Sequence, residues 1–128
     1  MLNGYLNLKV WNKAYKMTLK IYRLTKTYPK EETYGMTSQM RRASVSIIAN
    51  IAEGYGNKSL AEYIRFINNA LGSCNELGVY ILLSNDLDYL DNNDFKGIQA
   101  IQEEITKMLL GLRKALKKKD SEEKSNRN

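Results

Sequence analysis

The sequence predicts an all-α protein, an antiparallel up-and-down four-helix bundle. Apolar residues recur at alternating spacings of three and four in four separate segments, which is the period of one helix face. The links between these segments are short, and short links favour antiparallel neighbouring helices. The chain has 128 residues, of which 43% are hydrophobic and 27% charged, so it has the size and composition of one globular domain.

The first helix is predicted from Leu8 to about Tyr28. Pro29 ends it, because proline disfavours helical geometry in the residue before it and cannot donate a backbone hydrogen bond. The apolar face of this helix consists of Val10, Ala14, Met17, Ile21 and Leu24.

The second helix is predicted over about residues 36–54, after a polar link. Gly54 and Gly56 provide its stop signal, since glycine is frequent just after the last turn of a helix. Its apolar face consists of Met36, Met40, Ala43, Ile47 and Ile51.

A third, long helix is predicted to begin at the run Ser59-Leu60-Ala61-Glu62. This run matches a capping box, in which the serine and glutamate side chains satisfy free backbone amides at a helix start. The buried stripe then runs through Leu60, Ile64, Ile67, Leu71, Cys74, Gly78 and Ile81.

The fourth helix is predicted to begin near Asp94, with that residue or a neighbour as its cap. From Lys117 onward no apolar residue is available for burial, so we expect a frayed or disordered tail. The domain organisation is therefore a bundle over residues 1–116 and a basic, polar tail over residues 117–128. The apolar face of the fourth helix consists of Phe95, Ile98, Ile101, Ile105, Met108, Leu109, Leu112 and Leu116.

The composition leaves little for catalysis. Histidine is absent and Cys74 is the only cysteine, which excludes disulfide frameworks, imidazole and multi-thiolate metal sites, and histidine-activated nucleophiles. We therefore expect no enzymatic activity, no catalytic residue, no metal and no cofactor. Carboxylate chemistry through Glu53, Glu62 or Glu76 is the weakest alternative.

No apolar run approaches the roughly 20 residues that span a bilayer. The N-terminus lacks the basic segment and apolar block of a secretory signal. We expect a soluble, cytoplasmic protein without a membrane partner.

Basic residues form one line along the first helix. They follow one another at spacings of four, three, four and three, with no acidic residue in the row: Lys9, Lys13, Lys16, Lys20 and Arg23. The first sixty residues hold ten basic and three acidic residues, whereas the remainder is nearly neutral. Such a row is expected either to bind phosphates or simply to aid solubility, and the spacing alone leaves both open.

Two further helix faces carry candidate functional residues. Trp11, Tyr15 and Tyr22 lie to one side of the first helix; core or subunit contacts are favoured there over stacking on bases. The second helix carries a polar line bordering its apolar face, for which we expect a hydrogen-bond network that fixes helix register or a subunit contact, anchored by Arg42 with Glu53. This polar line consists of Gln39, Arg42, Ser46, Asn50 and Glu53.

The run from Thr37 to Gly54, TSQMRRASVSIIANIAEG, resembles the signature of four-helix bundle proteins encoded in intervening sequences of bacterial large-subunit ribosomal RNA genes. The resemblance covers about residues 5–116, and Ile48 departs from it, since relatives often have proline there. Further matches are Leu8-Lys9-Val10-Trp11 with Ala14, Tyr28-Pro29 before Glu32, and Ala70-Leu71-Gly72-Ser73 with Glu76-Leu77.

The resemblance implies a ring or barrel-like homopentamer. It also implies kinship with the accessory variability determinant of diversity-generating retroelements, a basic pentameric barrel that binds nucleic acid and a reverse transcriptase. We therefore expect a non-enzymatic accessory protein that binds RNA or DNA and partners a reverse transcriptase and its template RNA. The expected contacts are the helix-one row together with Arg41 and Arg42. The alternative is a ribosomal intervening-sequence protein that acts as a protein–protein adaptor or has an unassigned role.

Overall fold

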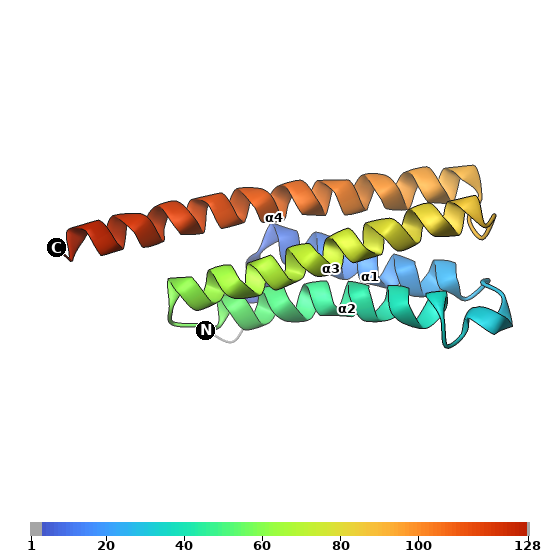
Figure 1. Ribbon diagram of the computed structural model, residues 1–128, viewed down its shortest axis with the longest axis horizontal. Coiled ribbons are helices and arrows are strands. Elements are labelled where there is room, and N and C mark those ends of the chain that lie inside the picture. The colour runs from blue at the N-terminus through green and yellow to red at the C-terminus, as the bar shows by residue number, and fades with distance from the viewer. Residues whose placement is uncertain (1–3, 128) are drawn as a thin grey trace.

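The computed structural model describes residues 4–127, and this part of the chain contains four α-helices and no strand. The helices lie side by side along one long axis (Figure 1). The expected all-α, four-helix architecture is confirmed. Residues 1–3 of the expected bundle segment and residue 128 of the expected tail lie outside the described residues. The helices are α1 (Lys9–Thr25), α2 (Met36–Tyr55), α3 (Leu60–Asp86) and α4 (Asn92–Asn126), and the short 3-10 turns are η1 (Tyr5–Asn7) and η2 (Lys30–Glu32).

Each helix packs against two others. α1 and α3 both contact α2 and α4, so they lie diagonally across the bundle. The order of contacts is reversed between consecutive helices. Met40 of α2 meets Ser84 of α3, whereas Ser46, further along α2, meets Ser73, which is earlier in α3.

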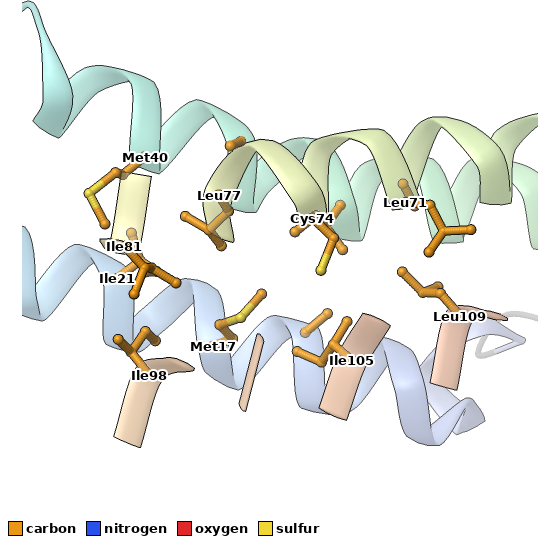
Figure 2. Close-up of a cluster of buried hydrophobic side chains, with 14 of the residues drawn as sticks. Met17, Ile21, Met40, Leu71, Cys74, Leu77, Ile81, Ile98, Ile105 and Leu109 are labelled. Carbon is orange, nitrogen blue, oxygen red and sulfur yellow. The ribbon is translucent and has the colours of Figure 1, made fainter. Parts of the chain in front are cut away.

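The core lies between the four apolar faces. Side chains from all four helices point toward one another there, among them Met17, Met40, Leu77 and Ile105 (Figure 2). All four are fully buried, and burial of a side chain of this size contributes about 1.5–3 kcal/mol. Most of the predicted face residues are buried, although Leu24 of α1 is only partly so.

α1 ends at Thr25, earlier than predicted. The Thr25 hydroxyl donates to the Ile21 carbonyl at 2.7 Å and accepts a hydrogen bond from Arg41 Nε at 3.0 Å. The hydrogen bonds of Thr25 therefore stabilise the last turn of α1, four residues before Pro29. Tyr28 is predicted to lie in the first helix but comes after its end. Its side chain is buried, and its ring centroid lies 5.1 Å from that of Tyr89.

Two of the predicted stop and start signals act differently from expectation. Gly54 lies inside α2, where a Cβ atom would come within 2.9 Å of Phe66 and Tyr63, so it permits close approach of α3 rather than ending the helix. At the start of α3, the Ser59 hydroxyl accepts from the Glu62 amide at 3.3 Å. The Glu62 carboxylate pairs with Arg65 at 2.8 Å instead of completing the capping box.

The C-terminal segment is helical, contrary to the expected disordered tail. α4 continues to Asn126 and runs past the ends of the other helices (Figure 1). Residues 112–127 contain neither glycine nor proline and are rich in residues of high helix propensity. Lys124 also pairs with Asp120 at 3.2 Å, one helical turn away, which supports the last turns.

Candidate nucleic-acid interface

The basic row of α1 borders a groove against α4. Lys9, Lys13, Lys16 and Arg23 are exposed, whereas Lys20 is partly buried. The helical spacing keeps all five on one side of α1, away from its buried face. The groove encloses about 290 Å³ and is lined by Lys13, Lys16, Met17, Lys20, Arg23, Ile101 and Glu104. We call it the basic groove.

α4 supplies two features that shape the basic groove. A Cβ atom on Gly97 would lie 2.9 Å from Lys20 Nζ, so the glycine leaves room for the lysine amine. Glu104 Oε1 lies 2.7 Å from Lys13 Nζ, and both side chains are about half exposed. The basic row contains no acidic residue in the sequence of α1, but in the folded chain a carboxylate of α4 lies beside it. This contact depends on how α1 and α4 pack, so the sequence of α1 does not show it.

The two arginines of α2 do not extend the lysine row. Arg41 is held at the end of α1: its Nε donates to Thr25, a terminal nitrogen donates to the Tyr22 carbonyl at 3.3 Å, and its guanidinium lies 4.7 Å from the Tyr22 ring centroid. Arg42 is exposed beside Tyr34 in an open depression of about 640 Å³ between α1 and α2. Arg41 thus supports the α1–α2 contact, although it is only partly buried and lines the same depression as Arg42.

The polar line of α2 connects α2 to α3 at its centre. The hydroxyls of Ser46 and Ser73 are hydrogen-bonded at 2.8 Å, and Asn50 donates to the Ser46 carbonyl at 2.8 Å. Ser46 thus makes one hydrogen bond to α3, and the wider network along the polar line stays a prediction. Within residues 4–127, however, Arg42 and Glu53 form no ion pair, so the expected electrostatic anchor is absent there.

Two exposed apolar faces lie outside the core. The first, on α1 and α2, consists of Tyr15, Leu19, Tyr22 and Val45, and we call it the aromatic face. The second, on α3 and the residue just after it, consists of Val79, Leu82, Leu83 and Leu87, and we call it the α3 face. Val79 is 61% exposed and Leu82 52% exposed, which is high for aliphatic side chains. Sequence analysis did not separate the α3 face from the core, because its residues alternate along the chain with those of the buried stripe, such as Ile81.

The thiol of the only cysteine lies in the core. Cys74 is buried, its Sγ lies 3.2 Å from the Thr106 hydroxyl, and burial raises the pKa of its thiol. Residues 4–127 hold no cluster of three or more His, Cys, Asp or Glu side chains that could bind a metal ion. No helix in this range is both long and apolar enough to cross a membrane.

The family model of the 23S rRNA-intervening sequence protein matches residues 6–111, most of the bundle. The chain belongs to this family. A crystal structure of a protein of unknown function from the S23 ribosomal protein family of Bacteroides thetaiotaomicron is similar in fold, with a TM-score of 0.75 and 26% sequence identity. The similarity covers 82% of this chain and 95% of that protein. No curated protein matches the chain.

The family match includes the basic row of α1, the polar line of α2, the whole of α3 and more than half of α4. It ends at residue 111, so the last part of α4 lies beyond it. The expected membership of the ribosomal intervening-sequence family is thus confirmed. The kinship with retroelement accessory proteins stays a prediction.

Proposed function

We propose that this 23S rRNA-intervening sequence family protein binds structured RNA through its basic groove, as a self-associating and non-catalytic protein. The observation that supports this best is the gathering of Lys13, Lys16, Lys20 and Arg23 around one groove between α1 and α4. Phosphates are the natural partners of such a row because each neutralised phosphate releases counterions.

The row has a cost in the free protein. Like charges three or four residues apart destabilise an exposed helix by about 0.2–0.5 kcal/mol per pair. Glu104 relieves part of this repulsion at Lys13, but it lies at one point of the row only. A bound phosphate backbone would relieve the rest, which favours a binding role over mere solubility.

The test compares three proteins on a hairpin RNA at several salt concentrations. In the first variant Lys13, Lys16 and Lys20 are changed together to glutamine. In the control Lys26, Lys30 and Lys58, which are exposed outside the basic groove, are changed in the same way. We expect the first variant alone to bind more weakly, with a salt slope smaller by about two to three. Equal affinities and equal slopes for all three proteins would refute the proposal.

Glu104→Gln provides the opposite perturbation. It removes the carboxylate beside Lys13, so RNA affinity is expected to rise while stability changes by less than about 1 kcal/mol, as for other exposed ion pairs. Fluorescence anisotropy with the same RNA measures it. Weaker RNA binding by Glu104→Gln would contradict an electrostatic attraction between the basic groove and the RNA phosphates.

The self-association that we propose is a head-to-tail contact between the aromatic face of one copy and the α3 face of the next. α1 and α3 lie diagonally in the bundle, so the two faces are separate surfaces. A homopentamer, as the resemblance implies, needs such a contact between unlike patches, because a two-fold contact pairs one patch with itself. The basic groove on the α1–α4 side would stay open in such a ring.

Mixing two variants tests this contact. Leu19→Glu with Val45→Glu disables the aromatic face, and Val79→Glu with Leu83→Glu disables the α3 face; all four positions are exposed, so folding should survive. Each variant alone is expected to be monomeric, and an equal mixture to form dimers and nothing larger, as sedimentation would show. If one variant alone stayed fully assembled, the head-to-tail contact would be wrong.

A protein–protein adaptor is the second candidate, because the α3 face is equally suited to a foreign protein. It predicts a monomer in isolation and a protein partner that survives nuclease and high salt on purification from the native host. We also propose a reverse transcriptase as a protein partner, as the resemblance to retroelement accessory proteins implies. A reverse transcriptase gene and a template repeat beside this gene would favour it, whereas a surrounding ribosomal RNA gene would favour the intervening-sequence setting.

A further inference from the structure

Beyond the basic groove, the middle and C-terminal part of α4 carries a second concentration of positive charge. Between Glu104 and Asp120 this helix has six basic residues and no acidic one. The second half of the chain is nearly neutral on average, but its charges are segregated along α4. They are Lys107, Arg113, Lys114, Lys117, Lys118 and Lys119.

Helical spacing places part of this charge in line with the basic groove. Gly97 and Glu104 of α4 face α1, at Lys20 and Lys13 respectively. Seven residues are nearly two helical turns, so Gly111 and then Lys118 continue the same side of α4. Lys107 and Lys114 lie three residues beyond Glu104 and Gly111, on adjacent positions of that side.

The line runs along the molecule and past the start of α1. From Arg23 back to Lys13 it follows α1 for about 15 Å, and from Glu104 to Lys118 it follows α4 for about 21 Å, at 1.5 Å per residue. The second stretch extends beyond Lys9, the first residue of α1, where α4 still lies beside the start of α3, since Lys119 lines a pocket with Leu60 and Ala61. The combined length of the two stretches is about 36 Å.

Two of the residues between these lysines of α4 are small. A Cβ atom on Gly111 would have no heavy atom within 4 Å, and Ala115 is exposed one turn later. Small residues at these positions leave room for a phosphate backbone between longer lysine side chains. Lys107, Lys114 and Lys118 are all exposed, and the ion pairs of α4 involve other residues.

We infer that the C-terminal part of α4 is a rigid RNA-binding arm, in which Lys107, Lys114 and Lys118 extend the basic groove into one continuous phosphate-binding track for a duplex stem. This inference rests on the proposed RNA-binding function and adds the site and the class of ligand. Lys114 and Lys118 lie beyond residue 111, so the arm is a feature of this chain outside the region that the family model matches.

The experiment uses the full chain and a hairpin RNA with a twelve-base-pair stem. Lys107, Lys114 and Lys118 are changed together to glutamine, and the control again carries glutamine at Lys26, Lys30 and Lys58. We expect the arm variant to bind roughly tenfold more weakly at low salt, with a salt slope smaller by about three, while the control binds like the parent.

A second variant tests the rigidity of the arm without changing any charge. Ala115→Pro interrupts the helix between Lys114 and Lys118, because proline removes a backbone hydrogen bond and clashes with the preceding turn. It is expected to lose affinity for the same stem. Circular dichroism confirms that the bundle remains folded.

The outcomes separate the inference from the function on which it rests. If the variant at Lys13, Lys16 and Lys20 loses affinity while the arm variant binds like the control, the arm is wrong and the groove stands. Full affinity of Ala115→Pro would likewise overturn the rigid track. If the parent shows no salt-dependent binding to the stem, both the groove and the arm are wrong.

Discussion

Glu32 shows how much a single side chain can connect in this bundle. Its Oε1 accepts from the Met36 amide at 3.1 Å, at the start of α2, and its Oε2 accepts from the Tyr89 hydroxyl at 2.8 Å, in the turn between α3 and α4. These two hydrogen bonds lower the pKa of Glu32. The hydrogen bond between Tyr89 and Glu32 also raises the pKa of Tyr89. One carboxylate thus joins two turns that are far apart in the sequence.

A pH dependence follows from the lowered pKa of Glu32. Because the folded pKa lies below the ordinary value of 4.5, the ionised carboxylate stabilises the fold at neutral pH, and this contribution is lost as the pH falls through the folded pKa. We expect Glu32→Gln to lower the thermal midpoint at pH 7, and the difference from the parent to shrink as the pH falls below 4.5. Thermal melts across this range measure it.

Tyr89→Phe is the matched control, because it removes one of the two hydrogen bonds and leaves the amide of Met36 bound. Its effect at pH 7 should be smaller than that of Glu32→Gln. A gap between Glu32→Gln and the parent that stayed constant down to acid pH would show that the ionised form is not responsible.

At the scale of the helices, Gly78 marks where α3 and α4 meet. A Cβ atom on Gly78 of α3 would lie 2.8 Å from Gln102 Nε2 of α4, whose amide donates to the Cys74 carbonyl at 2.9 Å. Gly78 therefore permits the buried hydrogen bond between the two helices. Gly111 of α4 is also helical but has open space around it, so packing within the chain gives no reason for a glycine there.

The two glycines give opposite predictions for the same substitution. Gly78→Ala should destabilise the protein, because Gln102 must shift and its buried hydrogen bond weakens, at a cost of about 1–3 kcal/mol. Gly111→Ala should stabilise it by up to about 1 kcal/mol through helix propensity. Chemical denaturation measures both, and stabilisation by Gly78→Ala would contradict the close approach of α3 and α4.

At the scale of the whole molecule, one core shared by four helices makes the bundle a single cooperative unit. Ile105 of α4 is fully buried and points toward the core between the helices (Figure 2). Small domains with one core usually unfold in a single transition. The part of α4 beyond Leu116 is largely exposed, so it contributes little to that core.

Ile105→Ala is therefore expected to lower the free energy of unfolding by about 2–5 kcal/mol while the transition stays single. Denaturation followed by circular dichroism and by Trp11 fluorescence should give coincident curves. Ser121→Pro, in the exposed arm, is the control and should leave the midpoint unchanged. Two separate transitions in the parent would contradict the single core.

The sequence by itself determined the four helices, most of their buried faces and the regular spacing of Lys9 to Arg23, because these depend on a local period of 3.6 residues. It also contained enough helix propensity to extend α4 to Asn126, although the lack of apolar residues there suggested disorder.

Only the tertiary structure decided what faces the basic row. Glu104 approaches Lys13 from a helix ninety residues away, and Arg41 turns to Tyr22 and Thr25 instead of joining the lysines. A helical period shows which side chains share a face, but it contains no information on which residues of another helix lie opposite. That is set by how the helices pack along their length, which is why the groove and its continuation along α4 appear only in the folded chain.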